Sequence, residues 1–393
     1  YDLAASRYPS GEDRDRAARN RDMITIWMTE GKYAEAEPLC RRALTIRENS
    51  LGPQDPDTAQ SFHNLAQLYC GQERHTEAEP LAKQALAIFE KVLGPDDVWV
   101  GVTLNTLATI HEARGKYTEA EPLYERALTI NEEALGPDHE RTGMALNNLA
   151  HLYRALGRYD EAEPLFQRSL LISEKVLGPQ HPEVAGTLHN LAELYRLKGE
   201  HTEAEPYIKR SLSIRETALG PNHPEVANGL NALGMVYLSQ GKTAKAEPVF
   251  KRSVEIKEKV LGPDHSEFAI SLQNLAYVHY AKGEHTEAEA LTKRALTIFD
   301  KVLGPEHPNV ASSLSILARL YHSQGNYEEA EPFYERALVI EEKALGLEHP
   351  GLVGLLENYA DLLRNLGRTT EADRLESQAE SIRAKHAIES PTH

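Results

Sequence analysis

Amide side chains recur in one column of this chain, at positions separated by multiples of 42 residues. Asparagine fills five of the eight positions: Asn64, Asn148, Asn190, Asn274 and Asn358. Each amide offers two N–H donors and a carbonyl acceptor, so a row of amides can hold the backbone of an extended peptide whatever its side chains are. The alternative is that the amides bond neighbouring helices and stabilise the stack. The sequence leaves both interpretations open.

Charged and aromatic residues beside this column could anchor a ligand. Arginine binds carboxylates through a planar fork, so these arginines would suit an acidic peptide even in a chain with 60 acidic and 43 basic residues. Glu193 and Asp361 share the same surface, and the alternative is that the arginines form salt bridges within the chain. The candidate anchors are Arg154, Arg196, Arg319, Arg364, His151, Tyr277 and Tyr280.

Trp99 is the outlier of its own column, in which the other copies carry Asp57, Arg141, Glu183, Glu225, Glu267, Asn309 and Gly351. A tryptophan at an otherwise polar position could anchor a partner protein. It could equally cover the top of its own repeat, because VWV at 98–100 replaces the more usual Pro-acid-Val.

Histidine recurs at six equivalent positions and invites a metal-site interpretation. Copies one repeat apart would be separated by about 10 Å, too far to share a zinc ion with bonds near 2 Å. We therefore expect turn residues and no metal site. The chain also lacks the phosphate-binding, serine-hydrolase and zinc-protease motifs, so we expect no catalytic residue and no cofactor. The six histidines are His139, His181, His223, His265, His307 and His349.

A repeat of 42 residues positions all of these side chains. The alanine of an EAE motif, which becomes KAE at 245–247 and EAD at 371–373, falls at residue 36 and then at every forty-second residue up to 372, nine copies in all, without insertion or deletion. An isoleucine follows ten residues later in every copy. A fixed period of this length indicates an array of stacked repeats, in which each unit depends on its neighbours for a core.

Each copy has the apolar spacing of two helices, which we name helix A and helix B in chain order. The stripes are Phe62, Leu65, Ala66 and Tyr69 for a helix A, and Ala120, Leu123, Ala127 and Ile130 for a helix B. A glycine between the helices, such as Gly115, occurs in eight of nine copies and predicts a left-handed C-cap. Residues 60, 64, 67 and 71 lie opposite the core stripe of helix A, so we expect them to face a ligand.

A proline lies inside helix B in most copies, as Pro122 does in TEAEP at 118–122. We expect Thr118 to cap this helix while Glu121 reaches back to it, and Pro122 would then remove only the first intrahelical hydrogen bond. If helix B begins two or three residues earlier, the proline would instead bend its first turn. The same capping box is expected at Thr76/Glu79, Thr202/Glu205 and Thr286/Glu289.

The repeated words N-L-A-x-L-Y, G-K/R-Y-x-E-A-E-P-L, R-A-L-x-I and L-G-P-x-H-P resemble the tetratricopeptide repeat in its 42-residue form, as in kinesin light chains and many bacterial proteins. The resemblance covers residues 15–386. It implies an all-α, right-handed α-solenoid of about nine antiparallel helical hairpins, with helices A lining a concave groove that binds peptides or proteins. In the family the corresponding asparagines hold the peptide backbone. The chain has more copies than kinesin light chains and no heptad segment, so kinesin attachment is not implied, and a bacterial relative is expected.

Net charge, apolar runs and cysteine content limit the classes of partner and the compartment that we expect. The net charge of −17 opposes nucleic acid and anionic membrane surfaces, and no apolar run approaches the roughly 20 residues of a membrane span. The two cysteines, Cys40 and Cys70, suggest neither a disulfide framework nor a zinc site, which fits a reducing, cytoplasmic location. We expect residues 1–14 to be a segment or remnant of an earlier repeat, and residues 387–393 to be a polar tail that caps the array.

The sequence thus predicts a non-enzymatic scaffold that binds a peptide or partner protein along helices A, an acidic one if the candidate arginines contact it. One alternative is the sensor or regulatory region of a larger signalling ATPase or protease-like protein. A second alternative is a structural array that self-associates through its ends, where near-identical repeats could stack.

Overall fold

The computed structural model describes residues 33–389, and within that range the protein is built from α-helices and one short 3₁₀ helix, as the repeat pattern predicts. The expected N-terminal segment 1–14, the first helix A and residues 390–393 lie outside the described part. The helices A are α3 (Pro56–Gly71), α5 (Val98–Ala113), α7 (Glu140–Ala155), α9 (Pro182–Leu197), α11 (Pro224–Ser239), α13 (Ser266–Ala281), α15 (Pro308–Ser323) and α17 (Val353–Asn365). The helices B are α2 (Tyr33–Leu51), α4 (His75–Leu93), α6 (Tyr117–Leu135), α8 (Tyr159–Leu177), α10 (His201–Leu219), α12 (Thr243–Leu261), α14 (His285–Val302), α16 (Tyr327–Leu345) and α18 (Thr369–Glu389).

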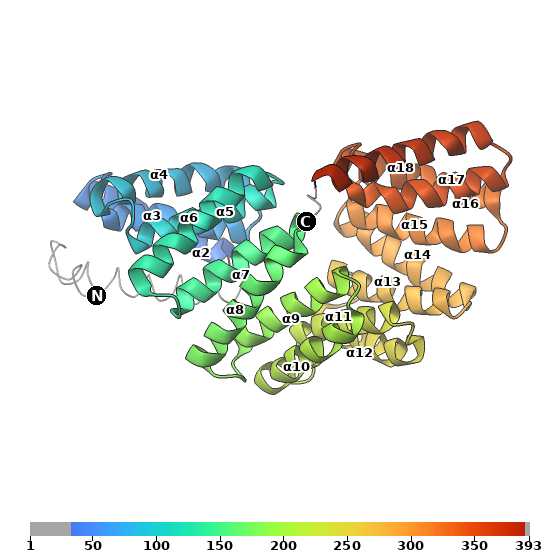
Figure 1. The fold of residues 1–393 in the computed structure, drawn as a ribbon, viewed down its shortest axis with the longest axis horizontal. Coiled ribbons are helices and arrows are strands. Elements are labelled where there is room, and N and C mark those ends of the chain that lie inside the picture. Colours follow the sequence, from blue (N-terminus) through green and yellow to red (C-terminus); the bar gives the residue numbers. More distant parts are fainter. Residues whose placement is uncertain (1–32, 390–393) are drawn as a thin grey trace. The chain divides into compact units, whose positions relative to one another are not determined.

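The chain divides into two compact units, Tyr1–Pro179 and Gln180–His393. Each unit is a stack in which every helix A packs against the helix B that follows it, and each helix B packs against the next helix A (Figure 1). The described residues hold α2 and eight complete hairpins, from α3–α4 to α17–α18. The last helix A differs from the others, because its first turn is the 3₁₀ helix η2 (Pro350–Leu352).

Helices A begin at a side-chain cap. Asp55 and Asp97 accept a hydrogen bond from the backbone N–H two residues later, at the starts of α3 and α5. In the following six repeats the predicted turn histidines take this role through Nδ1, as His223 does for the N–H of Glu225 at 3.2 Å. The interpretation of these histidines as turn residues is confirmed, and their place at the helix N-terminus adds the reason for it: Nδ1 satisfies one of the orphan donors there.

Glycine follows the end of every described helix A except α3, in the left-handed conformation that the sequence predicts. Gly115 has φ 71° and Gly157 has φ 75°, values that a residue without a β-carbon adopts at little cost. The one copy without glycine has Glu73, whose φ of 59° makes it the single non-glycine residue with positive φ in the described chain.

The predicted capping box at the start of helix B is wrong. Helix α6 begins at Tyr117, one residue before Thr118, and no side chain caps it at Lys116. The same holds at Thr76, Thr202 and Thr286, each of which is the second residue of its helix. Pro122 is consequently the sixth residue of α6 rather than part of its first turn. The glutamate that was expected to close the box is used elsewhere, as described below.

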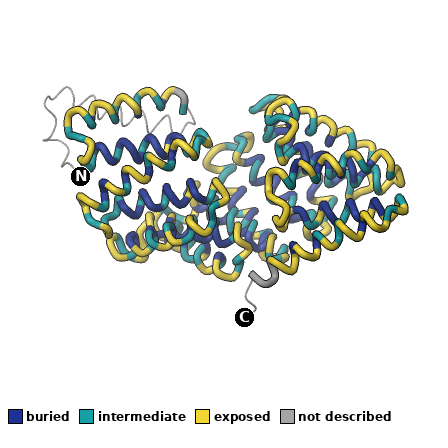
Figure 2. The backbone as a smooth tube through the Cα atoms, turned by 90° about the horizontal axis from the view of Figure 1, so that it is seen from above, coloured by how far each residue is buried: buried dark blue, intermediate teal, exposed yellow. Residues whose placement is uncertain are grey.

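Buried residues form a stripe along each helix, and the turns between helices are mostly exposed (Figure 2). The predicted core of α3 is confirmed, since Phe62, Leu65, Ala66 and Tyr69 are all buried. The alanine of every described EAE motif is completely buried, which allows the helices to pack closely.

Candidate functional site

The face of α3 opposite the core is accessible, as predicted, whereas Thr106 of α5 and Ile316 of α15, in the same column as Asn64, are buried. On α3, Gln60 and Asn64 are half-buried, and Gln67 and Gly71 are exposed. The equivalent faces of neighbouring A helices lie next to each other within each unit, because α5 contacts α7, and α15 contacts both α13 and α17. A surface made of A helices therefore runs through successive repeats and is the first place to look for a binding site.

Two asparagines of this surface bond each other across neighbouring A helices. Nδ2 of Asn148 on α7 donates to Oδ1 of Asn105 on α5 at 2.9 Å, and both residues are half-buried. The bond leaves the amide N–H groups of Asn105 and the carbonyl oxygen of Asn148 for a further partner. The two interpretations of the asparagine column are thus compatible at this rung, since the amide joins two helices and still offers a donor and an acceptor.

The other asparagines of the column differ in their contacts. Asn358 donates to the backbone carbonyl of Gly354 in its own helix at 2.6 Å. Asn64, Asn190 and Asn274 are half-buried on the same face. Their role as ligand contacts stays a prediction.

His151 is part of a hydrogen-bonded group in the first unit. Its Nδ1 lies 2.7 Å from Oε1 of Glu112, and the hydroxyl of Tyr124 donates to Oε2 of the same carboxylate at 2.8 Å. Thr109 completes the group, with Oγ1 3.0 Å from the Tyr124 hydroxyl. Burial and the charge of Glu112 raise the pKa of Tyr124, which keeps the phenol protonated. Since Nδ1 of His151 is occupied and the side chain is 44% exposed, Nε2 is the ring atom left for a ligand.

The four candidate arginines differ in what surrounds them. Arg196 forms a two-pronged ion pair with Glu193 on its own helix, at 2.6 and 2.8 Å. Arg364 pairs with Glu376 of α18 at 2.5 Å and with Asp373 at 3.3 Å. These contacts correspond to the salt-bridge alternative. Arg154 is half-buried on α7.

Arg319 is different, because no hydrogen bond or ion pair joins its guanidinium to any residue among 33–389. Its Cζ lies over the ring of Tyr280 at 5.1 Å from the centroid, an arrangement in which the cation is attracted to the aromatic face. Tyr277 is half-buried on the same helix as Tyr280, and both tyrosines pack against the buried residues around Leu317 of α15. The structure therefore brings together three of the predicted anchors, Arg319, Tyr277 and Tyr280, from α13 and α15.

Trp99 packs within its own part of the stack. Its ring is stacked on Phe89 of α4 at 5.7 Å between centroids, and it meets His63 of α3 edge-on at 6.3 Å. Trp99 is half-buried. Trp99 therefore packs within the stack, but against the preceding hairpin α3–α4 rather than over its own repeat.

The sequence analysis missed the role of the second glutamate of EAEP. In four described copies this glutamate pairs with a basic side chain 37 residues later, at the start of the next helix B, as Glu121 does with Arg158 at 2.6 Å. Arg158 also stacks on the ring of Tyr153, 4.0 Å from its centroid. The signal in the sequence was a lysine or arginine at this distance from the glutamate in five of the eight copies. Further pairs are Glu37–Arg74, Glu205–Lys242 and Glu331–Arg368.

Two other kinds of chemistry, reaction through a thiolate and metal binding, find no support among residues 33–389. Burial raises the pKa of both Cys40 and Cys70 to about 11, so neither is a reactive thiolate at neutral pH. Within residues 33–389, no three histidine, cysteine or acidic side chains form a group that could hold a metal ion.

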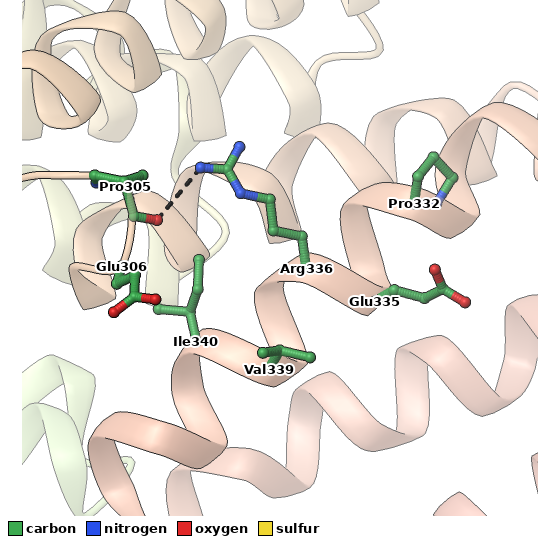
Figure 3. A pocket seen from close by; sticks show the side chains of 7 residues that line it. All are labelled: Pro305, Glu306, Pro332, Glu335, Arg336, Val339 and Ile340. Atoms are coloured by element: carbon green, nitrogen blue, oxygen red, sulfur yellow. Dashed lines mark hydrogen bonds between the residues drawn. The ribbon is translucent and has the colours of Figure 1, made fainter.

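A hollow of about 510 Å³ lies away from the A-helix surface, between the α14–α15 turn and α16 (Figure 3). Pro305, Pro332 and Val339 give it an apolar wall, and Arg336 crosses it to the carbonyl of Pro305 at 3.3 Å. Glu306, on its edge, is paired with Lys343 at 2.5 Å. Arg336 and Glu306 of the hollow are thus bonded within the chain. On the A-helix surface, by contrast, the Asn105–Asn148 pair and Arg319 keep polar atoms for a further partner.

The tetratricopeptide repeat model matches the chain in seven segments, most of which overlap: 25–91, 61–133, 99–170, 141–217, 183–259, 267–343 and 317–385. No curated protein sequence matches the chain. None of the helices within residues 33–389 combines the length and the low charge that crossing a bilayer requires.

Several solved structures share the fold. A Rap protein complexed with competence and sporulation factor is 14% identical, with a TM-score of 0.66 over 95% of this chain and 99% of that protein. The apo form of the quorum sensor NprR from B. thuringiensis is 14% identical, with a TM-score of 0.65 over 94% and 99%. BtubC from P. vanneervenii is 24% identical, with a TM-score of 0.51 over 58% and 92%. At these identities the likeness concerns the fold.

Proposed function

Because the chain belongs to the tetratricopeptide repeat family, we propose that it is a non-enzymatic scaffold that binds an extended peptide or a partner protein along its A helices. The observation that carries the proposal is the Asn105–Asn148 pair. A backbone amide of an extended segment presents an N–H and a C=O, and the pair retains an acceptor and donors that complement them.

Neighbouring groups would add selectivity to such backbone contacts. A few neutral hydrogen bonds, each worth roughly 0.5–1.5 kcal/mol net, barely offset the cost of association. His151, held by Glu112, and Arg319, stacked on Tyr280, supply groups that can recognise side chains. They lie in different units, so each unit has its own candidate contact.

The test begins with identification of what the intact chain binds. Proteins captured on the immobilised chain are identified by mass spectrometry, and the affinity of the main partner is then measured for variants. We expect Asn148→Ala combined with Asn190→Ala to lower the affinity for the partner more than tenfold, because two hydrogen-bonding side chains are lost. Gln84→Ala, which removes an exposed amide on helix α4, is the matched control and should leave the affinity unchanged.

Stability has to be followed in the same variants. Asn148→Ala leaves the amide of Asn105 without its partner, so a loss of about 1 kcal/mol is expected. Affinities are therefore compared well below the melting temperature. Full affinity in the double variant, at a temperature where it is folded, would return these asparagines to a purely structural role and contradict the proposal.

A further inference from the structure

Aspartate caps the first two described helices A, and histidine caps each later one. Asp55 and Asp97 accept the backbone N–H two residues later through a carboxylate oxygen, at the starts of α3 and α5. From α7 onward, Nδ1 of a histidine accepts the equivalent N–H at 3.0–3.3 Å. The first turns of the helices A are therefore held by two different kinds of acceptor. The histidine caps are His139, His181, His223, His265, His307 and His349.

The two kinds of cap respond differently to protons. An imidazole accepts a hydrogen bond at Nδ1 only while that nitrogen carries no proton, and histidine changes its charge between about pH 5 and 8. A carboxyl group keeps acceptor oxygens in either protonation state. A protonated imidazole would also place a positive charge at the positive end of the helix dipole, which is unfavourable. Acid therefore removes a histidine cap and leaves an aspartate cap in place.

A guanidinium beside three of the histidine caps opposes their protonation further. Arg252 of α12 donates to the backbone carbonyl of Pro221 at 3.1 Å, two residues before His223. A positive charge held at this position disfavours a second positive charge on the neighbouring imidazole. The equivalent contacts are Arg168 with Pro137 before His139, and Arg336 with Pro305 before His307.

The carboxylates around His223, His265 and His307 are paired with basic side chains, so they are less able to stabilise a protonated imidazole. Next to the caps, the pairs are Glu225–Arg215 at 3.9 Å, Asp264–Lys301 at 2.7 Å, Glu267–Lys257 at 3.4 Å and Glu306–Lys343 at 2.5 Å. Near the end of the preceding helix B, the pairs are Glu216–Arg252, Glu258–Arg294 and Asp300–Arg336. The charges that face these three caps are thus balanced without a proton on the imidazole.

We infer that the histidine-capped helices A form an acid-sensitive set, whose first turns loosen when the capping histidines take up protons between about pH 7.5 and 5. The unfolded chain binds these protons and the folded cap excludes them, so the stability of these helices falls as the pH falls. Helices α3 and α5 keep their caps through the same range. The inference does not depend on what the chain binds, because it concerns the starts of the helices alone.

Hydrogen–deuterium exchange of the full chain, followed by mass spectrometry, tests the inference turn by turn. Exchange at pH 7.5 and at pH 5 is expressed as protection relative to an unstructured peptide, so that the intrinsic pH dependence of exchange cancels. We expect the protection of the first turns of α11, α13 and α15 to fall about fivefold on acidification, the effect of losing one cap. The first turns of α3 and α5 should keep their protection. Unchanged protection in all of these helices, or an equal loss in α3 and α5, overturns the inference.

Asparagine caps locate the effect. A side-chain amide caps a helix as well as aspartate does and carries no titratable proton in this range. His223→Asn, His265→Asn and His307→Asn in one chain should therefore abolish the acid-induced loss at α11, α13 and α15. A loss that persists in this triple variant would assign the pH dependence to other groups and overturn the inference.

The matched control for the triple variant is His201→Asn combined with His285→Asn. These histidines are the first residues of α10 and α14, and neither is a helix cap. The loss of protection at the starts of α11, α13 and α15 should be the same in this control as in the wild-type chain. Its disappearance in the control would mean that the capping nitrogen is not the sensor.

The reciprocal variant moves the acid sensitivity to the start of the array. Asp55→His combined with Asp97→His gives α3 and α5 the kind of cap that the later helices A have. Their first turns should then lose protection at pH 5 and resemble the wild-type chain at pH 7.5, where circular dichroism verifies that the variant is folded. If α3 and α5 remain insensitive to acid with these caps, a histidine cap does not confer the sensitivity and the inference fails.

Discussion

The ring of Phe250 lies directly against Gly234, so that a β-carbon added at Gly234 would come within 2.5 Å of its Cζ. The equivalent position in the adjacent copies is alanine, at Ala192 and Ala276. Phe250 is fully buried on α12, the helix that pairs with α11. The phenyl ring thus uses the space that a methyl group uses in the neighbouring repeats.

Gly234→Ala should consequently destabilise the protein. Overfilling a packed position costs typically about 1–3 kcal/mol. Gly186→Ala is the matched control, since Gly186 is also inside a helix A but nothing lies within 4 Å of an added β-carbon. It should raise stability by roughly 0.5–1 kcal/mol through helix propensity. Urea unfolding followed by circular dichroism measures both, and equal effects of the two substitutions would show that the Phe250 contact is not tight.

Glu73→Gly should stabilise the first described turn between helices A and B. Glu73 holds a φ of 59° where the other copies have glycine, and a left-handed conformation costs a residue with a β-carbon about 1–2 kcal/mol. We expect a gain of about 1 kcal/mol in the unfolding free energy. The reciprocal change, Gly115→Glu, should lose a similar amount. Thermal melts of the two variants should move in opposite directions, and a shift in the same direction would contradict this account.

His223 offers a test of the capping role. His223→Ala removes the acceptor for the N–H of Glu225 and should cost about 1 kcal/mol. His223→Asp should preserve or slightly raise stability, because aspartate at the same column, as Asp55 and Asp97 show, caps α3 and α5, and a negative charge favours a helix N-terminus. Differential scanning calorimetry compares the three proteins. A loss in His223→Asp as large as in His223→Ala would mean that the cap is not the role of this side chain.

Glu205 predicts a pH dependence of stability. Hydrogen bonds from Lys209 and Lys242 lower its pKa from 4.5 to about 2. A folded-state pKa below the unfolded one adds stability that is fully present above pH 4.5 and is lost as the pH falls toward 2. Glu205→Gln should therefore cost about 1 kcal/mol at pH 7, and the difference from wild type should shrink on acidification.

The control for this prediction is Glu203→Gln. Glu203 is exposed on the same helix and has no ion-pair partner among the described residues, so its substitution should change little at either pH. Urea midpoints between pH 7 and pH 2.5 give the comparison. A gap between wild type and Glu205→Gln that stays constant with pH would contradict the assigned ion pairs.

The fold followed from the sequence because helix formation and core patterning are local. The apolar stripe around Leu65 and the glycine at 115 require only spacing and backbone preference, and both were predicted correctly. The prediction of a capping box was wrong because it assigned Glu121 a local hydrogen bond near Thr118, at the start of its own helix. Its carboxylate instead bonds Arg158 in the next repeat, and a contact between repeats depends on how the helices stack.

The candidate site was predictable in outline and not in its pairings. The open face of helix A and the half-buried asparagines could be derived from helical geometry. The Asn105–Asn148 and Glu112–His151 contacts join residues in different columns of neighbouring repeats. Comparison of equivalent positions in successive repeats cannot reveal these two contacts, because the lateral offset between two stacked helices is set by their packing.

Contacts that join successive repeats are short-range in the chain. Glu121 and Arg158 are 37 residues apart, and Asn105 and Asn148 are 43 residues apart, about a tenth of the sequence length. Such contacts close early in a folding reaction, since little loop entropy opposes them. During synthesis, a newly emerged hairpin would find its neighbour already in place and would not have to wait for the distant end of the chain.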